Sequence, residues 1–175
     1  MSENSFDALA QTMQALRDEN GCPWDRAQTL SSLKPFLIEE TYEVIDAIDE
    51  NNAEAHLEEL GDLLFQIVFQ SEIRREEGAF TFHDVAQSIN DKMRRRHPHV
   101  FGTGTARDKS DVTTNWDQLK QSERAGKKDA SRFAGIPKTA PGLLKAQRLG
   151  EKASRFGLDW KDATDVMGKI KEELA

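Results

Sequence analysis

Two pairs of acidic residues stand at helical spacing within the apolar segments between residues 35 and 77. Glu40 and Glu43 form one i, i+3 pair, and Glu59 and Asp62 form the other. On a helix, residues three positions apart project from the same side, so each pair can present its carboxylates to one point. Where two such helices lie side by side, the two pairs converge between them.

The residues around these pairs distinguish them from an ordinary solvated acidic face. Glu40 falls within a stripe of apolar residues at three- and four-residue spacing, namely Leu33, Leu37, Val44 and Ile48. Asp62 lies within a nearly continuous apolar run, namely Leu57, Leu60, Leu63, Leu64, Phe65, Ile67, Val68 and Phe69. A single acidic pair is typical of a surface, but a second pair inside an apolar run favours a metal site.

Clustered carboxylates need a positive partner, because like charges repel and desolvation disfavours each ionised group. No Lys or Arg lies on the inward stripe of either segment. A donor set made only of oxygen atoms, without His or Cys, suits a hard divalent cation. The sequence therefore predicts a Mg²⁺ site, at which Mn²⁺ can substitute.

The positions of Pro and Asn indicate how the two acidic segments are arranged. The first segment predicts a helix from about Ser32 to Glu50, with Pro35 tolerated in its first turn. The second predicts a helix that ends at Gly78. Because only Asn51 and Asn52 connect them, we expect an antiparallel hairpin in which the two acidic pairs face each other.

The remaining periodic segments also predict helices and no strand. A helix over residues 5–19 would be capped by Ser5, and another would start at a capping box formed by Thr81 and Asp84. Further helices are expected over residues 112–124, 143–156 and 163–175. The sequence thus predicts an all-α fold.

Basic residues gather at the end of the helix that starts at Thr81, in a protein of net charge -7. A helix C-terminus attracts cations through its dipole, but Lys92 followed by the arginines at 94–96 exceeds that need and favours phosphate binding. His97 and His99 have no Cys or further His nearby, so we interpret them as residues of a turn and not as metal ligands.

Trp24 lies in a turn sequence, Gly-Cys-Pro-Trp-Asp, where flanking polar helices do not account for an aromatic residue. It can plug one end of a helical core, which we favour, or form a wall against which a nucleobase stacks. Cys22 is the only cysteine, so we expect a free thiol in a reducing compartment.

The composition limits both the organisation of the chain and its partners. A chain of 175 residues, 37% of them hydrophobic, suits one globular domain with or without an appendage. Its acidic balance argues against nucleic-acid polymers and membrane surfaces, and no apolar run is long enough to span a membrane. The start of the chain does not resemble a secretion signal, so we expect a cytoplasmic protein.

Residues 125–141, rich in Gly, Pro and Lys, predict a linker between a domain at 1–124 and a helical appendage at 142–175.

Five motifs occur along the chain in an order that is highly specific as a set. They are Gly-Cys-Pro-Trp-Asp at 21–25, Gln-Thr at 28–29, Leu-Ile-Glu-Glu-Thr-Tyr-Glu-Val at 37–44, Glu-Glu-Leu-Gly-Asp-Leu-Leu-Phe-Gln at 58–66 and Arg-Arg-His-Pro-His-Val-Phe at 95–101. With these motifs, the chain resembles the MazG nucleoside triphosphate pyrophosphohydrolases over essentially its whole length.

The resemblance implies a four-helix core bundle that forms a homodimer, or a higher oligomer, and hydrolyses nucleoside triphosphates to monophosphate and pyrophosphate. Carried over by position, the Mg²⁺ ligands are Glu40, Glu43, Glu59 and Asp62. The residues implied to bind substrate are Asn90, Lys92, Arg95 and Arg96 for the phosphates, with Trp24 as the candidate for the base. Residues and resemblance together suggest that a metal-bound water attacks the α-phosphorus, with Glu39 or Glu43 as the catalytic carboxylate.

One departure from the family pattern concerns the end of the chain. Longer MazG proteins carry two such domains, and residues 169–175 resemble the opening of a second acidic helix, with Glu172 and Glu173 matching its first carboxylates. The following Glu-x-x-Asp is missing, so we expect a shorter member or the first domain of a two-domain protein.

Two alternatives to the enzyme stand beside it. The first is a non-catalytic nucleotide-binding or dimerisation module of a larger protein. The second, a di-iron carboxylate bundle, requires Glu-x-x-His pairs. It is disfavoured because His56 precedes Glu59 in the reverse order.

Overall fold

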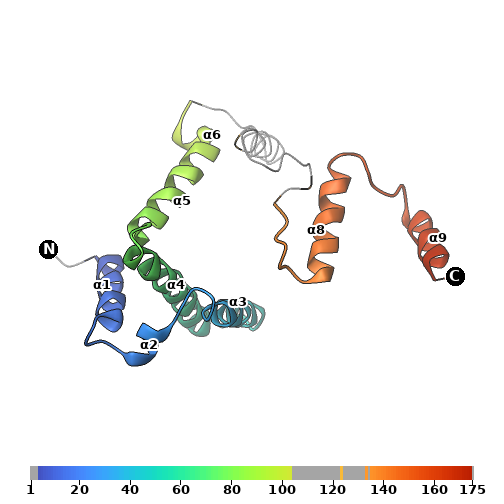
Figure 1. Ribbon diagram of the computed structural model, residues 1–175. Helices are drawn as coiled ribbons and strands as arrows, with labels where there is room; N and C mark the ends of the chain where they lie inside the picture. Colours follow the sequence, from blue (N-terminus) through green and yellow to red (C-terminus); the bar gives the residue numbers. More distant parts are fainter. Residues whose placement is uncertain (1–3, 104–122, 124–132, 134, 175) are drawn as a thin grey trace. The chain divides into compact units, whose positions relative to one another are not determined.

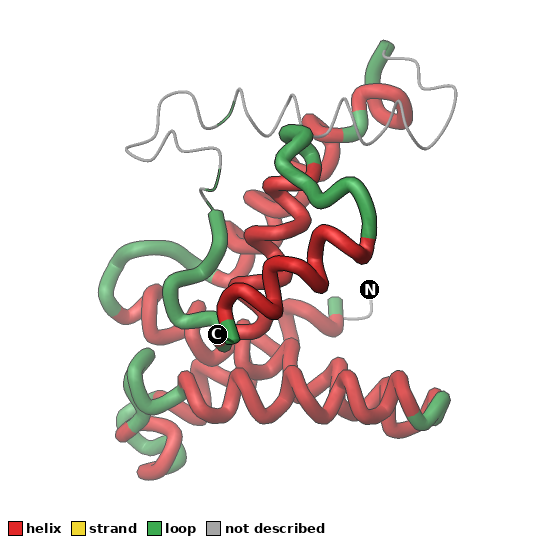
Figure 2. Tube along the Cα trace, turned by 90° about the vertical axis from the view of Figure 1, so that its right-hand side faces the viewer, coloured by secondary structure: helices red, strands yellow, loops and turns green. Residues whose placement is uncertain are grey.

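The computed structural model of the protein describes residues 4–103, 123, 133 and 135–174, and every regular element among these is a helix (Figure 2). The predicted all-α fold class is therefore confirmed for the described residues. Contacts along the chain separate two compact units, residues 1–105 and 106–175, which we describe individually.

The first unit is organised around one long helix. Its helices are α1 (Ser5–Arg17), α2 (Pro23–Ala27), α3 (Lys34–Asp49), α4 (Ala53–Glu76), α5 (Phe82–Arg96) and α6 (Pro98–Phe101). The central helix, α4, contacts α1, α3 and α5, and its contact with α3 is the most extensive (Figure 1).

The predicted hairpin of α3 and α4 is confirmed, with bounds that differ by a few residues at most from those expected. Asn52 caps α4, because its side chain accepts hydrogen bonds from the backbone amides of Glu54 and Ala55. Asn51 has a positive φ of 52°, a conformation that asparagine tolerates better than most residues. These two asparagines therefore form the tight turn that folds α4 back along α3.

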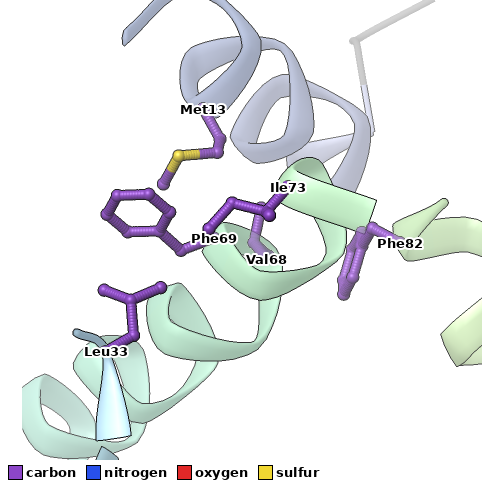
Figure 3. Close-up of a cluster of buried hydrophobic side chains, with 6 residues drawn as sticks. All are labelled: Met13, Leu33, Val68, Phe69, Ile73 and Phe82. Carbon is purple, nitrogen blue, oxygen red and sulfur yellow. The ribbon is translucent and has the colours of Figure 1, made fainter. Parts of the chain in front are cut away.

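The hydrophobic core lies around the C-terminal half of α4 (Figure 3). It joins helices α1, α4 and α5 with the residue that precedes α3, through the buried side chains of Met13, Leu33, Val68, Phe69, Ile73 and Phe82. Phe69 extends between the side chains of Met13 and Leu33. Because Glu59 and Asp62 lie in the N-terminal half of α4, they stand beyond the end of this core.

Capping determines where α1 and α5 begin. The predicted capping box of α5 is confirmed: the Thr81 hydroxyl accepts from the Asp84 amide at 3.3 Å, and the Asp84 carboxylate accepts from the Thr81 amide at 2.8 Å. The predicted cap of α1, Ser5, is wrong. Asn4 is the cap, and its side chain accepts from the amide of Phe6 at 3.2 Å. Both residue types are good caps, so their sequence alone does not decide between neighbours.

A buried arginine connects three helices of this unit. Arg17, at the end of α1, donates to the two carboxylate oxygens of Glu76 on α4 at 2.7 and 2.8 Å. It also donates to the backbone carbonyls of Asp25 and Gln28, in and just after α2. The segment between α1 and α3, which sequence patterns predict to be a turn, is thus held as a short helix against the rest of the unit.

The second unit contains α8 (Gly142–Ser154) and α9 (Ala163–Glu173), where the sequence predicts helices. Asp162 caps α9 by accepting from the amides of Thr164 and Asp165. The helix predicted over residues 112–124 and most of the linker predicted over 125–141 lie outside the described residues, so the domain limits stay predictions. Among the described helices, none is both long and apolar enough to cross a membrane.

Candidate metal centre

The hairpin of α3 and α4 brings together three of the four residues predicted to bind a metal. One carboxylate oxygen from each of Glu40, Glu43 and Glu59 lies within 4.8 Å of the other two. Glu40 and Glu43 come from α3 and Glu59 from α4, so the cluster exists only because the hairpin closes. Asp62, the fourth predicted ligand, is not part of this group of three.

Asp62 nevertheless belongs to the same electrostatic cluster. Burial raises the pKa of Glu40 above its usual value, and the negative charges of Asp62 and Glu43 raise it further. The pKa of Glu59 is also raised, first by desolvation and then by the charges of Glu43 and Asp62. The neighbouring carboxylates therefore make ionisation of Glu40 and of Glu59 less favourable.

The acidic cluster is more accessible to solvent than the apolar stripes suggest. Glu40 and Glu59 are partly buried, whereas Glu43 and Asp62 are exposed. The apolar segments around Glu40 and Asp62 therefore do not enclose the four carboxylates. The reason is that α3 packs mainly against α4, and the core that joins α1 and α5 to α4 lies farther along the hairpin.

The residues present fit a hard divalent cation. All the charged neighbours that shift the pKa of Glu40 or Glu59 are themselves acidic. The donor atoms that converge are carboxylate oxygens, the ligands that Mg²⁺ and Mn²⁺ favour. A cation here would offset the mutual repulsion that raises both pKa values. Glu39, the further acidic residue predicted for the site, is exposed on α3 and does not belong to the group of three.

The predicted phosphate-binding residues occupy a different part of the first unit. Asn90, Lys92, Arg95 and Arg96 lie in the second half of α5, which extends away from the end of α4 (Figure 1). None of these residues is among the charges that shift the pKa of Glu40 or Glu59. A single chain therefore does not place this basic segment of α5 on the acidic cluster of Glu40, Glu43, Glu59 and Asp62.

The end of α5 is ordered by contacts of its own. His97 caps the helix, and its Nδ1 lies 2.6 Å from the carbonyl oxygen of Met93. The guanidinium of Arg94 lies 4.7 Å from the centre of the Phe101 ring. These contacts agree with the interpretation of His97 as a residue of the turn.

Trp24 does not plug the core of this chain, because 53% of its surface is exposed. Its ring meets that of Phe36 edge to face, with centroids 5.8 Å apart. Phe36 precedes Glu40 by one turn of α3, so the aromatic pair lies near the start of the acidic face. About half of the Trp24 surface is therefore open to solvent.

One buried polar residue near the cluster was not singled out by the sequence. Gln66 lies one turn beyond Asp62 on α4, is only 7% exposed, and its side-chain oxygen has no hydrogen-bond partner within the described residues. The signal that could have found it is the same one that identified Asp62, a polar residue within an apolar run.

The chain is similar in sequence to known proteins. Residues 28–101, which contain the acidic cluster and the basic segment, match the MazG nucleotide pyrophosphohydrolase domain. The chain is 45% identical over 172 residues to a nucleoside triphosphate pyrophosphohydrolase of Escherichia coli (strain K12). It is 49% identical over 169 residues to a nucleoside triphosphate pyrophosphohydrolase/pyrophosphatase MazG of Thermotoga maritima. A Mycobacterium tuberculosis protein named nucleoside triphosphate pyrophosphohydrolase is 35% identical over 158 residues.

These matches cover nearly all of this chain but a smaller share of the relatives. They include 98% of the chain for the E. coli protein, 97% for the T. maritima protein and 89% for the M. tuberculosis protein. In the other direction, they span 65%, 64% and 46% of those relatives, less than two thirds of each length. Through the domain at residues 28–101, the chain belongs to the MazG family.

Proposed function

We propose that the chain hydrolyses nucleoside triphosphates to nucleoside monophosphate and pyrophosphate in a Mg²⁺-dependent reaction. The observation that carries this proposal is the convergence of Glu40, Glu43 and Glu59 within 4.8 Å, inside a domain that matches the MazG family. Relatives at 45% and 49% identity bear names of this activity, which supports the choice of substrate class.

In this proposal, the acidic cluster holds Mg²⁺ through Glu40, Glu43, Glu59 and Asp62, and Mn²⁺ can replace it. The cation supplies charge neutralisation for the phosphate oxygens and activation of water. Glu39 or Glu43 orients the water that attacks the α-phosphorus and accepts its proton. An exposed position on α3, as Glu39 has, allows a carboxylate to exchange that proton with solvent.

The basic segment of α5 is proposed to bind the β- and γ-phosphates through Lys92, Arg95 and Arg96, with Asn90 as a further donor. Guanidinium groups match phosphate oxygens in geometry as well as charge. Trp24 is proposed to stack on the base, which its exposed indole permits.

A homodimer would cover apolar surface that a single chain exposes. On α3, Ile38, Tyr42 and Ile45 are 58%, 57% and 43% exposed, and they lie on the side of the helix opposite Glu40. On α4, Leu57 and Leu60 are 74% and 45% exposed. Several exposed apolar side chains on two helices that pack together are typical of an interaction surface. We therefore propose that a second copy packs on this face, and that this assembly brings a basic segment to the acidic cluster.

A cytoplasmic location belongs to the same proposal. The sequence has one cysteine, Cys22, which is free in the structure, as is usual for proteins of reducing compartments.

The test measures pyrophosphate and monophosphate release from a panel of ribo- and deoxyribonucleoside triphosphates, with Mg²⁺ and with chelator. Glu40→Gln and Asp62→Asn should abolish metal-dependent turnover and preserve the helical circular dichroism. Both should also raise the melting temperature of the metal-free protein, because a neutral amide relieves repulsion. Asp46→Asn serves as the control, since Asp46 is an exposed residue of α3 that does not shift the pKa of Glu40 or Glu59.

Two results would redirect the proposal. Full activity of either cluster variant would show that the metal site is assigned to the wrong residues. Saturable nucleotide binding without turnover would favour a non-catalytic nucleotide-binding module. Such a module would be one part of a longer protein, and the chain spans 65% and 64% of the length of two relatives.

A further inference from the structure

Gln66 on α4 combines burial with an unmet hydrogen bond. Its side chain is 7% exposed, and its carboxamide oxygen Oε1 is buried without a partner. Among the described residues, only one other buried side-chain atom, Nδ1 of His99, has no partner. Buried acceptors in native proteins nearly always have a donor, because leaving one unsatisfied costs free energy. The position of Gln66 therefore implies a donor that the described residues of the chain do not supply.

The helical position of Gln66 shows where that donor belongs. Gln66 follows Asp62 by four residues and Glu59 by seven, so the three side chains lie on one stripe of α4. Phe69 and Ile73 continue the same stripe into the hydrophobic core. Gln66 thus stands at the boundary between the acidic cluster and the core.

The neighbouring carboxylates cannot satisfy the amide oxygen. An ionised carboxylate only accepts hydrogen bonds, and so does Gln66 Oε1. The apolar face of a second copy does not meet Gln66 either, and the basic side chains that this copy would bring to the acidic cluster are proposed to bind the phosphates of the substrate. The exposed apolar face that a second copy would cover includes Leu57, which lies on the opposite side of α4 from Gln66. Because Asp62 precedes Gln66 by one turn on the same stripe, a donor that arrives with the occupant of the acidic cluster would reach this position.

We propose that Gln66 is a positioning residue of the metal centre, whose Oε1 accepts a hydrogen bond from a water molecule in the hydration shell of the bound divalent cation. This inference rests on the metal site of the proposed function. Mg²⁺ and Mn²⁺ held by carboxylates keep several waters, and such waters are strong donors. Outer residues that hold a metal's ligands contribute to its affinity although they do not touch the ion.

The experiment measures Mn²⁺ affinity by electron paramagnetic resonance in the absence of nucleotide, together with the melting temperature of the metal-free protein. Gln66→Met keeps the length of the side chain and removes the acceptor. It should weaken Mn²⁺ binding by about tenfold or more, the usual effect of losing such a partner. It should not lower the metal-free melting temperature, since the acceptor it removes is unsatisfied there.

Two further variants separate a positioning role from a structural one. Gln66→Glu restores an acceptor, so it should bind Mn²⁺ at least as tightly as wild type, but its added negative charge should lower the metal-free melting temperature. Gln70→Met is the matched control one turn farther along α4. The Gln70 side chain donates to the backbone carbonyl of Gln66, which is not the group under test. This control should leave the Mn²⁺ affinity unchanged.

Gln66→Met that binds Mn²⁺ as wild type does would overturn the inference. The inference would also be overturned if Gln66→Met lowered the melting temperature of the metal-free protein and left the Mn²⁺ affinity unchanged. That result would identify Gln66 as an ordinary structural residue. If Asp62→Asn loses Mn²⁺ binding while Gln66→Met keeps it, the inference fails and the metal site stands. If the wild-type protein binds no Mn²⁺, both the proposed metal site and the inference about Gln66 fail.

Discussion

Replacement of Arg17 by methionine should test how the first unit is held together. The Arg17 side chain is 7% exposed and donates both to the carboxylate of Glu76 and to two backbone carbonyls. Methionine keeps an apolar side chain of similar reach beside Phe69, whose ring centre lies 5.5 Å from the guanidinium carbon. Arg17→Met therefore removes the hydrogen bonds and the charge while leaving much of the packing.

The expected loss of stability follows from the exposure of the partners. Removing one partner of a fully buried ion pair costs about 3–5 kcal/mol. Glu76 is 35% exposed and can be partly rehydrated, which lowers that cost. The two carbonyls that each lose a hydrogen bond from Arg17 raise it again, so we expect about 3 kcal/mol in the free energy of unfolding. For a unit of roughly 100 residues, this corresponds to about 15 °C in melting temperature.

Arg74→Met provides a matched control on the same protein. Arg74 pairs with Glu77 at 2.6 Å, but the two side chains are 42% and 49% exposed. Exposed pairs of this kind contribute about 0–1 kcal/mol, because water screens the charges. Urea unfolding followed by circular dichroism should therefore separate the two variants clearly. An Arg17→Met variant as stable as Arg74→Met would refute the reasoning.

The pH dependence of the Arg17 effect supplies a second readout. The hydrogen bond from Arg17 is the main cause that lowers the pKa of Glu76 below its usual value of 4.5. A carboxyl group with a lowered pKa stabilises the fold above its unfolded-state pKa and loses that contribution as the pH falls through the folded-state value. The stability difference between wild type and Arg17→Met should thus be full at neutral pH and shrink below pH 4.5. An equal difference at neutral and strongly acidic pH would exclude the ion pair as its source.

Three further predictions concern other parts of the first unit. Gly21→Ala should lower the melting temperature, because an added Cβ would collide with the backbone carbonyl of Leu16; an unchanged melting temperature would show that this turn can shift. Thr81→Ala should cost about 1 kcal/mol in urea unfolding through loss of the α5 cap, and Thr81→Ser should recover most of it. Tyr42→Glu should convert a dimer into monomers in sedimentation equilibrium, since Tyr42 is 57% exposed on the apolar face of α3; a dimer that persists would place the interface elsewhere.

Local features of the fold could be predicted from the sequence because they depend on neighbours along the chain. The spacing of Glu40 and Glu43 fixes them on one side of a helix, whatever packs around it. The capping box of Thr81 and Asp84 closes through hydrogen bonds across three residues. The short connection at Asn51 forces the next helix to turn back along α3. Errors in these predictions are confined to helix ends, such as the cap of α1, where Asn4 and Ser5 compete.

The tertiary structure decided the features that depend on which helix faces are covered. Sequence patterns place Glu59 and Asp62 on one stripe, but only the packing of α4 against α3 determines that Glu59 joins the close group while Asp62 acts through its charge. The exposure of Trp24 has the same origin, because nothing in its turn sequence shows whether another helix covers it.

The sequence by itself thus determined an all-α chain with a hairpin of paired carboxylates and a basic helix end, because helical periodicity and capping act over a few residues. Only the tertiary structure revealed that Arg17 reaches Glu76, which lies 59 residues away in the sequence. It also decided that Gln66 is buried with an unsatisfied oxygen. Both features arise where distant segments exclude water together, and no local pattern specifies which segments meet.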